Sequence, residues 1–327
     1  MQQLTYIVSG TADAQHKAEQ AREKLARLPH VESLLITAVA PCEMPLAKAL
    51  RMRDALRETF PQARILVHTC ALKMADLNLD TEGVMLTFTA FESALVEFVL
   101  VEGNTADAAA RERIVSFIGA RPATRAVELF VVGVMSKIDA LFEGISVIDP
   151  QIEVFGAFVD APPMNARGYL VADDTVTQIG MLAAVFHGET LDVHAVRNFG
   201  WNPLGSEIVA TRVEGCTVKE LNGDTPIKIY ERYFGIKGDG DFSTEAALFP
   251  LCFEEPDGSI SARVPIKIEE GSGELTFAIP IQEGTTFRLA YGDPYGILSQ
   301  AAENTREMAA FSPQAIFGTA CVGHYLL

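Results

Sequence analysis

The sequence predicts an α/β protein with mixed β-sheets, and three observations favour this class. Short apolar runs alternate with helical stretches over the first third, two later apolar runs lie close enough to pair, and strand-like runs dominate the rest. We therefore expect two similar halves whose mixed sheets pack together, with helices outside. The length of 327 residues also favours two halves, because single cores usually stop growing near this size.

The first third predicts the order strand, helix, strand, helix, strand. Each helix contains Ala, Glu, Lys and Arg at helical spacing and stops at a proline, which cannot continue a helix. The five elements are expected at 4–9, 12–28, 34–39, 46–60 and 65–68.

Two apolar runs at 84–89 and 94–99 follow, and their short polar connection favours an antiparallel pair. The alternation then continues with helices and strands expected at 107–118, 129–135, 138–145 and 152–158. Pro162-Pro163 interrupts this pattern. We place the boundary there, with an N-terminal half over 1–165 and a C-terminal half over 166–327.

The second half is richer in strands. Asp173-Asp174 predicts a hairpin turn inside the first long strand region. Helices are expected at 218–234 and 295–310, and strand regions at 168–186, 191–199, 263–268, 275–281, 286–290 and 315–325.

Composition excludes several classes of function. A net charge of −17 repels phosphate backbones and anionic membrane surfaces, so we expect neither nucleic-acid binding nor membrane insertion. The longest apolar runs are strand-sized, too short to cross a bilayer. The N-terminus lacks the basic and apolar regions of a secretory signal, which favours a cytoplasmic location.

Cysteine usage agrees with a reducing compartment. The five cysteines are scattered, odd in number and without a CxxC pair, so no disulfide framework is expected. The sequence also lacks the P-loop, GxGxxG, HExxH and GxSxG motifs. We therefore expect no cofactor and no enzymatic activity.

The histidines and cysteines leave one chemical alternative open. His68 and Cys70 are two residues apart on a predicted strand and so share a face, while Cys321 and His324 lie near the last predicted strand. Together they could hold zinc or form a nucleophile and base, which would make the protein a Cys/His-dependent or zinc-dependent hydrolase. The simpler interpretation is that they are ordinary strand-end or core residues.

One segment carries an unusual combination of residues. The run from Asn198 to Gly205 places Trp201, the single tryptophan, between two glycines and beside a proline. Gly200 permits close backbone approach, and an indole ring offers a flat face with one N–H donor. A tight turn capped by a core tryptophan would explain the same residues.

The motifs that follow resemble the FIST domain family. The pattern G-W-x-P-x-G at 200–205 precedes V-x-T-R at 209–212, V-x-E-L-N-G at 218–223 and Tyr230. The E-G turn at Glu283-Gly284 and the segment 317–321, which ends in Cys321, are similar to the C-terminal part of that family. The resemblance spans nearly the whole chain and is strongest from 168 to 230.

The resemblance implies a small-ligand-binding sensory input domain of bacterial-type signal transduction. It implies ligands such as amino acids and an output domain, such as a diguanylate cyclase, beyond Leu327. A homodimer is a companion hypothesis, and a protein-interaction scaffold without a small ligand is a further alternative.

The ligand site is expected at strand ends between the halves. The sequence departs from the family pattern at 67–71, where a Gly-Cys-Ser turn is expected, at 156–158, where paired glycines are usual, and at His324, where an arginine is common. The candidate lining residues are Asn198, Gly200, Trp201, His68, Cys70, Gly156, Cys321 and His324.

Overall fold

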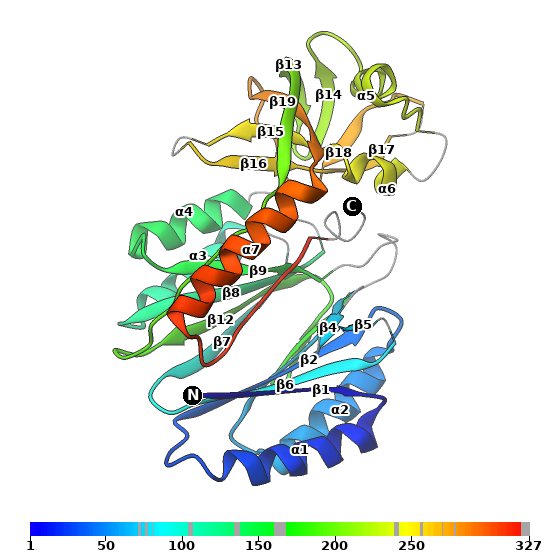
Figure 1. Cartoon of the computed structure of the whole chain (residues 1–327). Coiled ribbons are helices and arrows are strands. Elements are labelled where there is room, and N and C mark those ends of the chain that lie inside the picture. Colours follow the sequence, from blue (N-terminus) through cyan, green and yellow to red (C-terminus); the bar gives the residue numbers. More distant parts are fainter. Residues whose placement is uncertain are drawn as a thin grey trace. The chain divides into compact units, whose positions relative to one another are not determined.

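The computed structural model describes the chain in two compact units (Figure 1). The described residues are 1–70, 73–75, 78–80, 82–103, 107–133, 138–159, 168–238, 242–255, 258–269, 271–277 and 279–321. Unit 1 contains Met1–Val134, Asp139–Ala195 and Ser312–Thr319, and unit 2 consists chiefly of Val196–Phe311. The predicted boundary at Pro162-Pro163 lies outside the described residues and stays a prediction.

Unit 1 is built from two consecutive runs of elements that have the same order. The first run is β1 (Gln2–Val8), α1 (Thr11–Leu25), β2 (Ser33–Pro41), α2 (Leu46–Thr59), β3 (Arg64–Cys70), the hairpin β4 (Lys73–Ala75) and β5 (Asn78–Asp80), and β6 (Val84–Phe91). The second is β7 (Leu95–Glu102), α3 (Ala108–Gly119), β8 (Thr124–Val132), α4 (Ile138–Ile148), β9 (Glu153–Phe158), the hairpin β10 (Leu170–Ala172) and β11 (Thr175–Thr177), and β12 (Gly180–His187).

The two runs are structural repeats because their strands are also arranged alike. The first sheet contains the order β1-β6-β2-β3 and the second the order β7-β12-β8-β9. In both, the first three strands pair antiparallel and the last two parallel. The predicted α/β class with mixed sheets is therefore confirmed. The two similar repeats both lie before residue 196, whereas the predicted halves were 1–165 and 166–327.

The antiparallel pairing predicted between 84–89 and 94–99 is wrong. These runs are β6 and β7, and β6 pairs with β1 and β2 while β7 pairs with β12. The short connection between them joins the last strand of one repeat to the first strand of the next. It therefore crosses from one sheet to the other.

The hairpin β10–β11 ties the repeats together. It lies in the sequence of the second repeat, yet β10 pairs antiparallel with β3 of the first sheet, Leu170 opposite His68 and Ala172 opposite Leu66. The turn at Asp173-Asp174 was predicted correctly. The first sheet therefore has six strands, and two of them come from the second repeat.

Alternating side chains of the strands form three apolar layers in unit 1. On β2, Ile36 and Ala38 pack with α1 and α2, whereas Leu35 packs with residues of the second sheet. Leu66 on β3 and Phe130 on β8 share another cluster between the sheets. Helices α3 and α4 cover the outer face of the second sheet (Figure 1). Unit 1 is thus a helix, sheet, sheet, helix sandwich.

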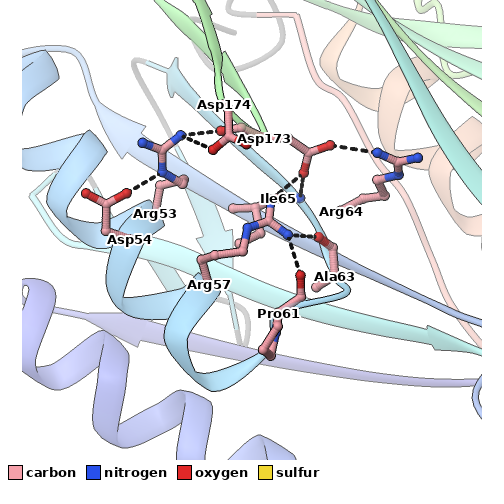
Figure 2. A network of polar contacts seen from close by, with 9 residues as sticks. All are labelled: Arg53, Asp54, Arg57, Pro61, Ala63, Arg64, Ile65, Asp173 and Asp174. Atoms are coloured by element: carbon pink, nitrogen blue, oxygen red, sulfur yellow. Dashed lines mark hydrogen bonds and ion pairs between the residues drawn. The ribbon is translucent and has the colours of Figure 1, made fainter.

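Asp173 anchors the turn of the exchanged hairpin. This residue has a φ of 51°, and its carboxylate accepts hydrogen bonds from Arg57 at 2.7 Å, Arg64 at 3.0 Å and the backbone N–H of Ile65 at 3.0 Å. Arg53 donates to the Asp173 carbonyl oxygen. Figure 2 shows these groups converging on the turn from α2 and β3. Charge-assisted bonds of this kind fix the hairpin against the edge of β3.

Unit 2 contains one antiparallel sheet of seven strands, in the order β16-β15-β19-β13-β14-β18-β17. Its elements are β13 (Trp201–Glu214), β14 (Thr217–Leu221), α5 (Pro226–Phe234), α6 (Phe242–Ala247), β15 (Leu251–Glu254), β16 (Ile260–Arg263), β17 (Pro265–Ile268), β18 (Leu275–Phe277), β19 (Thr286–Gly292) and α7 (Pro294–Phe311). Its core includes the buried rings of Tyr230, Phe277 and Phe287.

Three predicted elements of the second half differ in the structure. Residues 191–199 form no strand, and 315–321 form none either. The helix predicted over 218–234 is instead β14 followed by α5, because Asn222 and Gly223 adopt positive φ and Pro226 begins a new helix. Within the described residues, no helix is long and apolar enough to cross a membrane.

We predict that Asp173→Asn lowers the free energy of unfolding by about 1–3 kcal/mol, because it leaves two guanidinium groups and one N–H with a weaker acceptor. Asparagine tolerates the positive φ, so the backbone conformation is retained. Denaturant titration would measure the change. The control is Asp174→Asn, whose side chain is 91% exposed, and a loss of equal size there would contradict the role of Asp173.

Candidate functional site

The carboxyl ends of β1, β2 and β3 meet at one edge of the first sheet. β2 and β3 are parallel, and β1 points the same way because both β1 and β2 pair antiparallel with β6. Ligands of α/β proteins usually bind at such edges, since the loops that follow parallel strands converge there.

A cavity of about 630 Å³ lies at this edge. Loops that follow β1 and β2, the first turns of α1 and α2, and the start of β6 form its wall. The lining residues are Ser9, Gly10, Thr11, Pro41, Glu43, Met44, Pro45, Lys48, Arg51, Met52, Glu82 and Val84. Its volume suits a small metabolite.

The wall of this cavity carries both signs of charge. Lys48 and Arg51 supply two cations from α2, and Glu43 and Glu82 supply two carboxylates. The N-cap residues of the two helices are Gly10 and Pro45, and neither supplies a side-chain capping hydrogen bond. The partial positive charge of the first turn of α2 therefore adds to that of the two basic side chains, whereas Asp13 offsets it in the first turn of α1.

Two thiols lie beside the cavity. Cys70 at the end of β3 is paired with Pro41 at the end of β2, and Cys42 is the next residue after Pro41. The two thiols therefore lie at the ends of neighbouring strands. Burial, followed by the nearby Glu43 and Cys70, raises the pKa of the Cys42 thiol to about 11. A protonated thiol is a poor nucleophile. Cys42 is therefore suited to packing at neutral pH.

Tyr169 completes this edge from the exchanged hairpin. Its hydroxyl donates to the carbonyl oxygen of Met44 at 3.1 Å, and burial raises its pKa to about 12. The bond joins the segment before β10 to the loop that lines the cavity. The hairpin thus helps to shape the wall of the cavity.

In the structure, His68 is buried and Gly156 is closely packed, and neither residue lines the first cavity. The His68 ring is 7% exposed, lies 4.7 Å from the ring of Phe130, and burial lowers its pKa to about 4. Gly156 on β9 has a φ of 141°, and an added Cβ would lie 1.9 Å from the carbonyl oxygen of Leu129. Both positions have packing constraints that explain the residue found there. Their role in ligand binding stays a prediction.

The tryptophan segment packs inside unit 2. Trp201 is the first residue of β13, not a turn after a strand, and its ring lies 5.9 Å from that of Phe199. Asn198 Nδ2 donates to the carbonyl oxygen of Ile297 at 3.2 Å, and an added Cβ on Gly200 would collide with the Ile297 side chain. The segment therefore fits closely against the start of α7.

The remaining predicted residues are divided between the two units, and one of them lies outside the described residues. Cys321 is exposed and belongs to unit 2, and His324 lies outside the described residues. His68, Cys70 and Gly156 belong to unit 1, and Asn198, Gly200 and Trp201 to unit 2. Among the residues that the structure describes, no three His, Cys, Asp or Glu side chains are placed to hold a metal ion.

A second cavity of about 620 Å³ lies at the opposite edge of the first sheet. Its polar lining includes Arg57, Arg64 and Asp173, which are bonded to one another in the network of Figure 2. Because this network already satisfies the guanidinium and carboxylate groups, its evident role is to hold the hairpin. The first cavity is the better candidate for a ligand.

Sequence reasoning missed the residues that line the first cavity. Thr11 lies between the predicted strand 4–9 and the helix that follows it, and Glu43 lies between the predicted strand 34–39 and the helix 46–60. A polar residue between a strand and the following helix is the signal that could have indicated them. The histidines and the tryptophan drew attention instead, because those residue types are rarer.

The fold and the cavity define an α/β module with a ligand-sized pocket at a strand-end edge. The chain belongs to the FIST family: the FIST N domain matches residues 34–224 and the FIST C domain matches residues 226–327. The resemblance noted in the sequence is thereby confirmed. FIST domains are sensory modules of signal-transduction proteins and are not a known family of enzymes. A search of curated proteins found no match.

Glu128, which lies in the layer between the sheets, should make the stability of the protein depend on pH. Its side chain is 7% exposed on β8, and burial raises its pKa from an ordinary 4.5 to about 8. The unfolded chain therefore releases this proton at a lower pH than the folded protein. The contribution of Glu128 to stability is complete below about pH 4.5 and is lost as the pH rises through about 8.

We predict that Glu128→Gln removes this dependence. The free energy of unfolding of the native protein minus that of the variant should fall by roughly 1.4 kcal/mol per pH unit between about pH 5 and 8. Chemical denaturation at several pH values would measure it. Glu153→Gln removes a charge from an exposed side chain on the neighbouring strand and serves as the control. A difference that does not change with pH would contradict the burial of an ionisable carboxyl.

Proposed function

We propose that this protein is a sensory input domain that binds a small zwitterionic metabolite, such as an amino acid, in the first cavity of unit 1. The observation that carries the proposal is the pairing of Lys48 and Arg51 with Glu43 and Glu82 around one ligand-sized space. The cationic side chains suit a carboxylate and the acidic ones suit an ammonium group.

The proposed site has features of a binding site more than of a catalytic one. Burial keeps the neighbouring Cys42 thiol and Tyr169 hydroxyl protonated at neutral pH. His68, the nearest strand-end histidine in sequence, is enclosed between the sheets. These groups support recognition and packing, and they offer no activated nucleophile or base.

We further propose that ligand binding controls an output domain, such as a diguanylate cyclase, in the cytoplasm. A ligand can do so only if it binds one conformation of the module more tightly than another. Loops from β1, β2 and β6 line one cavity, so a ligand that contacts all three would favour one arrangement of them. Among the residues that the structure describes, no two cysteines form a disulfide bond, which is consistent with a reducing compartment. A homodimer would bring two outputs together.

The first experiment is a thermal-shift screen of the full chain against amino acids, small dicarboxylates, nucleotides and divalent metal ions. A ligand present at one hundred times its Kd should add about 2.7 kcal/mol to stability. Stabilisation by amino acids would support the proposal. Stabilisation by zinc alone would favour the hydrolase hypothesis, and no stabilisation by any compound would favour the scaffold.

We predict that Arg51→Ala weakens binding of the ligand so found by about 10–100-fold, because one charge-assisted hydrogen bond is lost. Calorimetric titration would measure the Kd. Arg22→Ala, which removes an exposed arginine from the far end of α1, is the matched control. Trp201→Phe keeps the packing of unit 2 but removes the indole N–H. An affinity that is unchanged in Arg51→Ala and lost in Trp201→Phe would move the site to unit 2.

A further inference from the structure

The segment that follows α7 returns to unit 1. Helix α7 belongs to unit 2, whereas Ser312–Thr319 packs with unit 1. We call Ser312–Thr319 the strap. The strap follows α7 of unit 2 directly in the chain, and it packs with unit 1.

The strap is bonded to the inner face of the first sheet. Gln3 of β1 donates from Nε2 to the carbonyl oxygen of Ile316 at 3.2 Å, and the N–H of Ile316 donates to Gln3 Oε1 at 3.1 Å. Leu4 and Tyr6 of the same strand pack with the core beneath α1 and α2. Because side chains alternate along a strand, Gln3 lies on the other face, toward the second sheet.

The strap also packs on the inner face of the second sheet. The ring of Phe317 lies 5.3 Å from that of Phe186 on β12 and 6.2 Å from that of Phe155 on β9. These side chains belong to the apolar cluster between the sheets. Neighbouring residues of the strap thus contact opposite sheets, and the strap closes one side of the layer between them.

The attachment has the features of an element that opens locally. The strap forms no β-strand, its backbone bonds to Gln3 involve a single side chain, and Ile316 is 60% exposed. Phe317 is the residue that packs in the aromatic cluster. Segments with few buried contacts and exposed hydrogen bonds open at low free-energy cost.

A buried carboxyl lies next to Phe155, whose ring the strap contacts. Glu128 of β8 is directly opposite Phe155 of β9, so the two side chains are neighbours on the inner face. The Glu128 residue is 7% exposed. Enclosing such a group is unfavourable, and opening the strap would let water reach it. The closed state therefore carries a cost that the open state relieves.

We propose that Ser312–Thr319 is a releasable strap, held by Gln3 and Phe317, and that its release from the layer between the two sheets is the conformational response of this module. The role of strap release as a response to ligand rests on the proposed sensory function, whereas the release of the strap does not depend on that function. An equilibrium between attached and released states of one segment is the kind that a ligand can shift.

Hydrogen exchange of the full chain, read by mass spectrometry without any ligand, tests the release. We expect the amides of the strap to exchange faster than those of β2 and β8. Gln3→Ala and Phe317→Ala should each raise the exchange rate of the strap about tenfold or more while the strands keep their protection. Gln2→Ala and Phe142→Ala, which alter a neighbouring glutamine and an exposed phenylalanine on α4, are matched controls. Glu128→Leu, which removes the buried polar group, should lower the exchange rate of the strap.

Three results would overturn the proposal. The first is a strap that exchanges as slowly as β8, and the second is loss of protection throughout unit 1 in both strap variants, since either makes the strap part of the core. The third is a dimer whose strap contacts are exchanged between two copies. A ligand that binds in calorimetry yet leaves the exchange of the strap unchanged would overturn only the role of release as the response. Absence of any ligand would overturn the proposed function and leave the release itself supported or refuted by the variants.

Discussion

The architecture of unit 1 depends on the pairing of β10 with β3. Without β10, the parallel pair β2–β3 would end in an open edge, and Leu170 and Ala172 would be missing from the layer between the sheets. An exposed sheet edge is a site for unwanted pairing, and a hairpin that covers it removes that hazard. The arginines of α2 and β3 that bind Asp173 therefore help to hold both sheets of the sandwich together. The same pairing of β10 with β3 also places Tyr169 beside the cavity.

Local signals were sufficient for most elements and insufficient for their pairing. Helices α1 and α2 were predicted close to their observed limits because helical spacing and the following prolines act within a few residues. The partners of β6 and β7 depend on which sheet each strand joins, and no local pattern encodes that choice. The run 191–199 shows the opposite failure: its apolar residues pack against the inter-sheet cluster without any strand pairing, as Leu191 and Val193 do.

The site was harder to predict than the fold, for a physical reason. The side chains around the first cavity come from two helix starts and three strand ends, and each is an ordinary residue in an ordinary loop. These side chains come together because β1 and β2 run in the same direction and therefore end on the same side of the sheet. His68 and Cys70 were correctly placed together on one strand, but spacing cannot show that the imidazole would be enclosed against Phe130. Burial decides the chemistry of a histidine, and burial is a tertiary property.

The exchanged hairpin also has a consequence during synthesis. The chain leaves the ribosome from its N-terminus, so β3 emerges roughly 100 residues before β10. At about 5–20 residues per second, the first sheet waits on the order of 5–20 s for the strand that covers its edge. A nascent first repeat is therefore exposed to aggregation through β3 for that interval, and a fragment that ends before β10 would remain so permanently. Although the two repeats are similar, the first repeat cannot complete its sheet until the hairpin of the second repeat has been synthesised.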